Sequence, residues 1–193
     1  MTIRFDVGDA LIVGDVQNDF LPGGSLAVSG GDEVIAPLNR CMEQFHAQGL
    51  PIVAVRDWHP EHHCSFQERG GPWPPHCVQN THGAEYAPGL RLPEGTHAVI
   101  KGTLPDKDAY SAFDGTGLHA WLREQDVERL FVGGLCTDYC VRQTTPDARK
   151  LGYEVYVLVD AVRAVSADTE DAAFDEMRLA GAHPVSSDEL LPA

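Results

Sequence analysis

Two cysteines stand four residues apart in the segment GGLCTDYCVRQT, and three kinds of chemistry could use them. Cys136 and Cys140 could bind a metal together, form a disulfide, or act as one nucleophile beside an inert thiol. A shared metal would need both thiols on one helix face, but the pattern predicts that Cys136 ends a strand and Cys140 lies in the first turn of the next helix. Because a helix N-terminus stabilises a thiolate, Cys140 is the predicted nucleophile. Cys136, Cys41 and Cys64 are interpreted as small buried residues.

A nucleophilic thiol needs a base to take its proton and a cation to stabilise the resulting anion. Asp15 follows the apolar run ALIVG, and Lys101 follows the apolar run HAVI. Taken alone, an aspartate after a strand is more often a turn residue or a helix cap. An acid, an amine and a thiol at the ends of separate apolar runs are harder to explain in that way. We therefore predict that Asp15 is the base and Lys101 the cation for Cys140.

Histidines gather in two later segments, RDWHPEHHCSF and GPWPPHCVQN. Asp57 and His59 are two residues apart, so in an extended chain their side chains point the same way. His76, held by the stiff sequence PWPPH, is the best candidate for a third ligand, and His63 is a possible fourth. Two histidines and one carboxylate with open positions suit Zn²⁺, Fe²⁺ or Mn²⁺.

Two other interpretations of these segments stay open. Cys64 and Cys77 could form a thiolate-rich zinc site, or the histidines could belong to a polar loop that binds no metal. We expect His62 to face solvent.

Aromatic residues flank both groups of candidate residues. Phe20 follows Asp15 in DVQNDF, and Trp73 precedes His76. Aromatic side chains in loops at a sheet edge could enclose a flat ring, although ordinary packing would use the same residues.

The elements that must position these residues alternate between short apolar runs and helical patterns. The predicted strands are 10–13, 51–55, 97–100, 129–134, 154–159 and a weak 183–187, and the predicted helices are 32–48, 117–125, 139–151 and 168–181. Continuous Val/Ile/Leu runs are typical of strands buried on both faces. The alternation predicts an α/β fold, a three-layer sandwich in which a mostly parallel sheet is flanked by helices. Ligands of such sheets bind at the carboxyl ends of the strands, where Asp15, Asp57, Lys101 and Cys140 would converge. Asp160, after 154–159, is interpreted as a cap or loop anchor.

Length and composition set broader limits. The chain has 193 residues and a net charge of −15, which argues against nucleic acid and anionic membranes as partners. We expect one domain over residues 1–193. The N-terminal segment lacks the pattern of a signal peptide, and no run reaches the about 18 apolar residues of a membrane helix. Five cysteines without an export signal indicate reduced thiols and a cytoplasmic location.

Six segments, in the same order, resemble the nicotinamidase (pyrazinamidase) branch of the isochorismatase-like cysteine hydrolases. They are DVQNDFLPGGSLAV, RDWHPEHHCSF, GPWPPHCVQNTHGAE, KGTLPDKDAYSAF, GGLCTDYCVRQT and VSADTEDAAFDEM. The resemblance implies that Asp15, Lys101 and Cys140 are catalytic. It implies that Asp57, His59 and His76 hold the metal, and the position of His63 is a ligand only in some members. It further implies that Phe20 and Trp73 hold a pyridine ring. It also implies an oxyanion hole of the backbone N–H groups of Cys136 and Cys140, with a cis peptide bond between Leu135 and Cys136.

The activity that the resemblance implies is metal-dependent hydrolysis of nicotinamide to nicotinate and ammonia through a cysteine thioester, feeding NAD salvage, with pyrazinamide as a further substrate. The metal would be zinc, iron or manganese, and a homo-oligomer is possible. Hydrolysis of another small amide or of a vinyl ether, a non-catalytic metal-binding domain and a redox role for the cysteine pair are the alternatives.

Two positions depart from the family pattern. Cys136 stands where the family usually has alanine, which puts a second thiol near the site. Pro146 stands inside the predicted helix 139–151, and because an interior proline removes a backbone hydrogen bond, we expect a kink or an irregular turn there.

Overall fold

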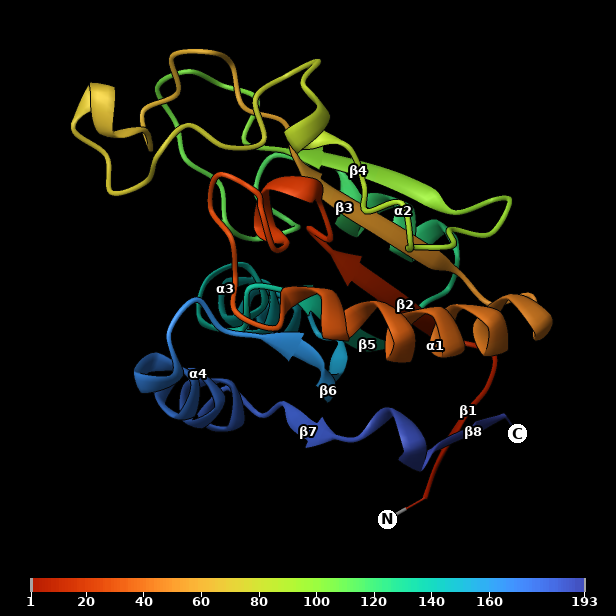
Figure 1. Ribbon diagram of the computed structural model, residues 1–193. Coiled ribbons are helices and arrows are strands. Elements are labelled where there is room, and N and C mark those ends of the chain that lie inside the picture. Colours follow the sequence, from red (N-terminus) through yellow and green to blue (C-terminus); the bar gives the residue numbers. More distant parts are fainter. Residues whose placement is uncertain (1, 193) are drawn as a thin grey trace.

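A six-stranded, wholly parallel β-sheet forms the centre of the molecule. The computed structural model describes residues 2–192, and the strands lie in the order β4-β3-β2-β5-β6-β7. Their bounds are β2 (Asp9–Gly14), β3 (Ile52–Asp57), β4 (His97–Lys101), β5 (Arg129–Leu135), β6 (Glu154–Arg163) and β7 (His183–Val185). The arrowheads of β2 and β3 point toward the end where the segments around residues 60–80 gather (Figure 1). The predicted parallel sheet is confirmed.

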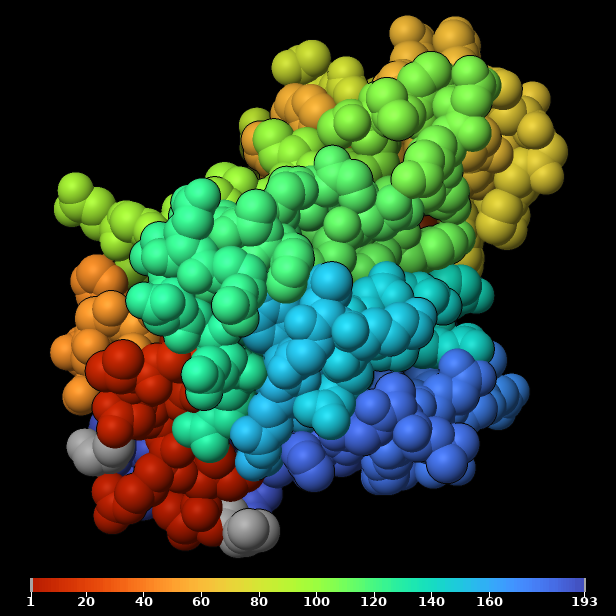
Figure 2. Space-filling view, turned by 180° about the vertical axis from the view of Figure 1, so that it is seen from behind, coloured from red at the N-terminus to blue at the C-terminus, as the bar shows by residue number. Residues whose placement is uncertain are grey.

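Helices cover both faces of this sheet. They are α1 (Ile35–Ala47), α2 (Leu118–Glu124), α3 (Arg142–Lys150) and α4 (Ala167–Leu179). Buried Leu38, Met42 and Phe45 of α1 pack against one face in a cluster that includes Leu11 and Val13. Residues of α2, α3 and α4 pack with Ala10 and Ile12 on the other face, the side seen in Figure 2, where the green to blue segments that carry these helices lie. The alternation of Leu11 and Val13 with Ala10 and Ile12 explains why this strand is apolar without interruption, and the predicted three-layer α/β fold is confirmed.

A small second sheet joins the two ends of the chain and was missed by sequence analysis. Strand β1 (Ile3–Phe5) pairs in parallel with β8 (Leu190–Pro192), and Figure 1 shows these two strands side by side. Phe5 stacks on Phe45 of α1 with ring centroids 4.6 Å apart. Three-residue strands are too short to show a periodic pattern, so only the tertiary contact identifies them.

Two predicted helices begin later than expected. The range 32–48 starts with a 3₁₀ turn, Gly31–Val34, before α1 begins. The range 139–151 contains part of a π-helical turn, Thr137–Val141, and α3 begins only at Arg142. Pro146 lies inside α3, so the irregular turn comes before this proline. Because the carbonyl group that a proline obstructs is four residues earlier, the obstruction falls on Arg142, the first residue of α3.

The predicted strand 154–159 extends four residues further, to Arg163. Asp160 therefore lies within β6 rather than after it. Its carboxylate accepts hydrogen bonds from the backbone N–H (2.7 Å) and the hydroxyl of Ser187, so it does anchor the segment after β7. The predicted strand 183–187 ends early, at Val185, because this anchored segment turns away from the sheet.

The segment between β3 and β4 contains only two 3₁₀ turns, Gln67–Arg69 and His82–Ala84, as regular structure. Within residues 2–192, none of the helices has the length and apolar character needed to cross a membrane. The expectation of one domain over residues 1–193 includes Met1 and Ala193, which lie outside the described residues, and it stays a prediction.

Candidate active site and metal-binding group

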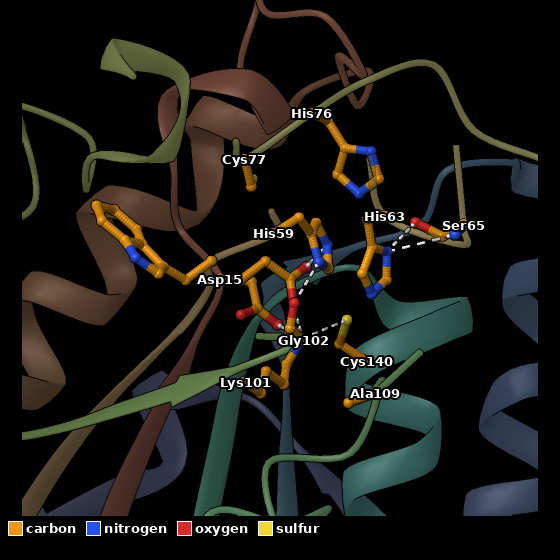
Figure 3. Close-up of polar contacts among 12 residues, drawn as sticks. Asp15, His59, His63, Ser65, His76, Cys77, Lys101, Gly102, Ala109 and Cys140 are labelled. Atoms are coloured by element: carbon orange, nitrogen blue, oxygen red, sulfur yellow. Dashed lines mark hydrogen bonds and ion pairs between the residues drawn. The ribbon is translucent and has the colours of Figure 1, made fainter. Parts of the chain in front are cut away.

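The predicted site residues meet at the carboxyl edge of the sheet. Asp15 follows β2, Asp57 ends β3, Lys101 ends β4, and Cys140 lies in the turn after β5. All four side chains are buried. Because β2, β3, β4 and β5 are adjacent parallel strands, their ends bring these residues together, as Figure 3 shows for Asp15, Lys101 and Cys140.

The Lys101 ammonium lies at the centre of the group. Its Nζ atom is 3.2 Å from Asp15 Oδ2, 2.5 Å from Asp57 Oδ1 and 3.4 Å from Cys140 Sγ. One oxygen of each carboxylate and the Cys140 sulfur all lie within 4.8 Å of one another. Asp15, Lys101 and Cys140 also line one small cavity. The acid, the amine and the thiol are therefore close enough to act on one bond.

Two buried carboxylates share this single ammonium, and the pKa values reflect it. Burial alone would lower the pKa of Lys101, but Asp15 and Asp57 outweigh it and raise the pKa well above its usual value. Burial raises the pKa of Asp15 to about 6, against the effect of Lys101. Asp15 also forms an ion pair with Lys101, and hydrogen bonding with the Cys140 thiol lowers its pKa. The Asp15 carboxylate is therefore placed to accept the thiol proton.

The expected stabilisation of a Cys140 thiolate by a helix N-terminus stays a prediction, and the burial of the thiol opposes it. Cys140 lies in the π-helical turn that precedes α3. Burial raises its pKa well above the usual value, and Lys101 only partly opposes this effect. The thiol is therefore protonated at neutral pH and needs a base before it can act as a nucleophile.

Asp57, His59 and His76 form a second group, and one ligand-type atom from each lies within 4.8 Å of the others. The Nδ1 atom of His59 is 2.9 Å from the Gly102 carbonyl oxygen, and that of His76 is 2.8 Å from the Pro74 carbonyl oxygen. Carbonyl oxygens only accept, so each Nδ1 carries the proton and each Nε2 keeps its lone pair. Burial lowers the pKa of His76, which favours the neutral imidazole that binds metals. The donor set and the carbonyl contacts behind it fit Zn²⁺, Fe²⁺ or Mn²⁺.

His63 lies beside this group without joining it. Its ring stacks on His59 with centroids 4.2 Å apart, and Figure 3 shows it next to Ser65. The Nε2 atom contacts the Lys107 carbonyl oxygen at 3.1 Å, and the Nδ1 atom contacts Ser65 Oγ at 2.7 Å. Because both ring nitrogens have other partners, nothing here supports His63 as a ligand, and that role stays a prediction.

The thiolate-rich alternative is not assembled. Across residues 2–192, neither Cys64 nor Cys77 belongs to a group of converging metal-type donors. The Cys77 thiol is buried, and burial raises its pKa well above the usual value, which disfavours the thiolate that a metal would need. His62 is exposed, as expected.

The two predicted ring-binding residues lie near different parts of the site. Phe20 is 5.7 Å from His76 between ring centroids. Trp73 lies 4.9 Å from Tyr139, the neighbour of Cys140, and its indole N–H donates to the Tyr110 hydroxyl at 3.0 Å. Sequence analysis missed both tyrosines. The position of Tyr139 beside Cys140 was the one available signal, whereas Tyr110 is recognised only by its contact with Trp73.

The turn that carries Cys140 begins at Cys136. The Leu135–Cys136 peptide bond is cis, as the resemblance implied. The Cys136 carbonyl oxygen accepts from the backbone N–H groups of Tyr139 (3.2 Å) and Val141 (3.1 Å), which closes the turn. The use of the Cys136 and Cys140 N–H groups as an oxyanion hole stays a prediction.

Polar residues that hold the site together were also missed. The Asp138 carboxylate accepts from Thr169 Oγ1 (2.5 Å) and the Val165 N–H (2.9 Å), which joins the Cys140 turn to the start of α4. The Asp19 carboxylate accepts from the Cys77 N–H at 2.7 Å, next to His76. Each of these residues adjoins a predicted site residue, but sequence does not show which backbone group its side chain reaches.

Comparison with known proteins agrees with this geometry. The model of the isochorismatase domain family matches residues 9–189. A nicotinamidase/pyrazinamidase of Mycobacterium tuberculosis is 42% identical, over 92% of this chain and 98% of that protein. The crystal structure of pyrazinamidase of Pyrococcus horikoshii in complex with zinc is 50% identical, with a TM-score of 0.90 over 93% of this chain and 99% of that one.

A second solved structure extends the likeness over the whole chain. The structure of PnC1 from L. infantum in complex with nicotinate is 39% identical, with a TM-score of 0.95 over 100% of both chains. The family model, the sequence relatives and the solved structures point to one group of proteins. This chain therefore belongs to the isochorismatase domain family.

Proposed function

We propose that this chain is a metal-dependent amidohydrolase that converts nicotinamide to nicotinate and ammonia and also hydrolyses pyrazinamide. The observation that carries the proposal is the placement of Asp15 and Cys140 around Lys101, directly beside Asp57, His59 and His76. Relatives named as nicotinamidases and pyrazinamidases, and a neighbour in complex with nicotinate, support this choice of substrate.

The first half of the reaction forms a thioester. Asp15 takes the proton of the Cys140 thiol, and the sulfur attacks the amide carbon. The Cys136 and Cys140 N–H groups would hold the oxyanion, a contact often worth about 3–4 kcal/mol of the barrier. When the C–N bond breaks, Asp15 returns the proton to the nitrogen and ammonia leaves. The Lys101 ammonium, 3.4 Å from Cys140 Sγ, would stabilise the negative charge on the sulfur while the thiol proton is on Asp15.

The second half releases the acid. Asp15, now ionised again, takes a proton from a water molecule, and the resulting hydroxide attacks the thioester carbon. The C–S bond breaks, Cys140 recovers its proton from Asp15, and the product leaves as nicotinate after its new carboxylic acid loses a proton to water. The same carboxylate thus serves as base and acid in both steps, as its pKa of about 6 allows near neutral pH.

Asp57, His59 and His76 would hold one divalent metal ion, among Zn²⁺, Fe²⁺ and Mn²⁺. A bound ion supplies a Lewis acid that can bind the ring nitrogen of a pyridine and lower the pKa of water. Phe20 and Trp73 would enclose the pyridine ring, which orients the carboxamide toward Cys140.

Ammonia release from nicotinamide, with metal analysis of the same purified protein, tests the proposal. We expect one divalent ion per chain and turnover of both nicotinamide and pyrazinamide. A protein that binds the ion but hydrolyses only another small amide would support the alternative substrate class. A thiol-selective reagent should label Cys140, and nicotinamide should block this labelling. If no ammonia is released and nicotinamide does not change the labelling of Cys140, the chain is a non-catalytic metal-binding domain.

We also propose a cytoplasmic role in NAD salvage, with nicotinamide as the small-molecule partner. All five cysteines are free thiols, which fits a reducing compartment. A homo-oligomer is possible, and measuring molar mass in solution by light scattering would test it.

A further inference from the structure

The chain leaves the sheet at Asp15, one residue after β2 ends. The pairing of β2 with β3 stops at Gly14 and Val55, and Asp15 turns away with a φ of 53°. Strand β3 continues to Asp57 beyond this point. The Asp57 backbone therefore lies where β2 no longer offers a main-chain partner.

The side chain of Gln17 fills this place. Its Oε1 atom accepts from the Asp57 N–H at 2.8 Å, and its Nε2 atom donates to the Asp57 carbonyl oxygen at 2.8 Å. The second N–H of the same amide donates to the Ala84 carbonyl oxygen at 2.9 Å. A primary amide has the same donor and acceptor as a peptide group, so Gln17 extends the β2–β3 hydrogen bonding by one step. Gln17 itself is fully buried, with 0% exposure.

These contacts hold Asp57 from one side while β4 holds it from the other. Asp57 is paired with Lys101 of β4, and the next N–H, that of Trp58, donates to the Lys101 carbonyl oxygen at 3.0 Å. Gln17 is also bonded to the backbone of Asp15, because the Gln17 N–H donates to the Asp15 carbonyl oxygen at 2.9 Å. One residue thus connects the backbone of the predicted base with the backbone of a predicted metal ligand.

We propose that Gln17 is a positioning residue for metal binding, and this inference rests on the proposed function. By fixing both backbone groups of Asp57, the Gln17 amide sets the direction of the Asp57 carboxylate toward His59 and His76. Partners behind metal ligands commonly change affinity about 10-fold to 100-fold when they are removed. The Gln17 amide bonds the backbone of Asp57, so it would affect metal binding through the position of Asp57.

The chain offers a matched control for this role. Asn39 of α1 is also a buried amide that bonds two backbone groups, the Gly89 carbonyl oxygen and the Arg91 N–H, both at 2.9 Å. Its side chain joins α1 to the segment 89–91, and neither of these two partners is a site residue. Asn39→Leu removes the same kind of amide-to-backbone hydrogen bonds without changing the contacts of Asp57. It therefore measures how much the loss of such hydrogen bonds lowers the stability of the fold.

The test compares Gln17→Met, Gln17→Asn and Asn39→Leu with the wild-type chain. Zinc affinity is measured by competition with a chromophoric chelator, beside urea unfolding midpoints and kcat and KM at saturating zinc. We expect Gln17→Met to bind zinc about 10-fold to 100-fold more weakly and Gln17→Asn to be intermediate, because its amide is one methylene too short. Asn39→Leu should lower the unfolding midpoint but bind zinc within about threefold of wild type.

Either of two results would overturn the proposal. One is wild-type zinc affinity in both Gln17 variants, and the other is an equal loss of affinity in Asn39→Leu. The Asn variant keeps an amide at this position, so the conclusion does not depend on folding of the Met variant. A wild-type chain that binds zinc but hydrolyses no amide would overturn the proposed function and leave the role of Gln17 standing, whereas a wild-type chain that binds no divalent ion would overturn both.

Discussion

The two edges of the central sheet both hold buried carboxylates beside a cation, but they differ in how these charges are matched. At the amino edge, Asp9 and Arg129 form a two-point ion pair with distances of 2.7 and 2.5 Å. At the carboxyl edge, one ammonium, that of Lys101, serves both Asp15 and Asp57. The Asp9–Arg129 pair has one charge of each sign, and the group around Lys101 has an excess carboxylate.

Hydrogen bonding differs in the same way. Asp9 also accepts from the Asp6 N–H at 2.7 Å, so its carboxylate is well satisfied. Asp15 instead shares the Lys101 ammonium with Asp57 and interacts with the Cys140 thiol. A groove of about 610 Å³ lies at the amino edge beside Asp9 and Arg129, yet these groups are already paired with each other. The comparison teaches that reactivity is located by a buried carboxylate that shares its cation and lies beside a thiol, and not by the size of a cavity.

Replacing the nucleophile should produce the largest contrast between two neighbouring thiols. Cys140→Ala should lower kcat by on the order of 10⁴-fold or more, because no other group can form the thioester. Cys136→Ala should change kcat by less than about tenfold, since only its backbone N–H is used. Ammonia release from nicotinamide measures both, and wild-type turnover by the Cys140 variant would end the proposed mechanism.

Replacing one carboxylate at each edge tests the contrast directly. Asp15→Asn should lower kcat/KM by about 10²-fold to 10⁴-fold, the usual contribution of a general base. Asp9→Asn removes a carboxylate that only pairs with Arg129, so kcat/KM should stay within about twofold of wild type. Comparable losses in the two variants would mean that the edges do not differ in function.

Removing the metal should have a smaller effect that can be reversed. Dialysis against a chelator should lower kcat/KM by about tenfold or more, and added Zn²⁺, Fe²⁺ or Mn²⁺ should restore it. The same ions should raise the unfolding midpoint, because they bind only the folded chain. Full activity in a chain shown to be metal-free by elemental analysis would contradict a role for the ion.

The smallest effect is expected at the amino edge and concerns stability alone. Arg129→Met leaves the buried Asp9 carboxylate without its cation, which should lower the free energy of unfolding by about 2 kcal/mol. Urea unfolding measures this change, and kcat should be unaltered. A stability change near zero would show that solvent replaces the guanidinium, which is partly exposed, without cost.

Residue types and spacing alone predicted the layers of the fold and the positions of the site residues. Apolar runs that end in Asp15, Asp57, Lys101 and the Cys140 segment indicated parallel strands with polar carboxyl ends, because strands buried on both faces leave no other place for such residues. The short strands β1 and β8 were missed, since their pairing joins residues at opposite ends of the chain.

Only the tertiary structure decided which groups are buried together and what surrounds them. Burial raises the pKa of the Cys140 thiol well above its usual value, and the Lys101 ammonium only partly opposes this effect. The role of Gln17 depends on a backbone forty residues later in the chain. Solvation and long-range hydrogen bonding are properties of the folded arrangement, so a local sequence pattern can name the reactive residues but cannot set their charge or their partners.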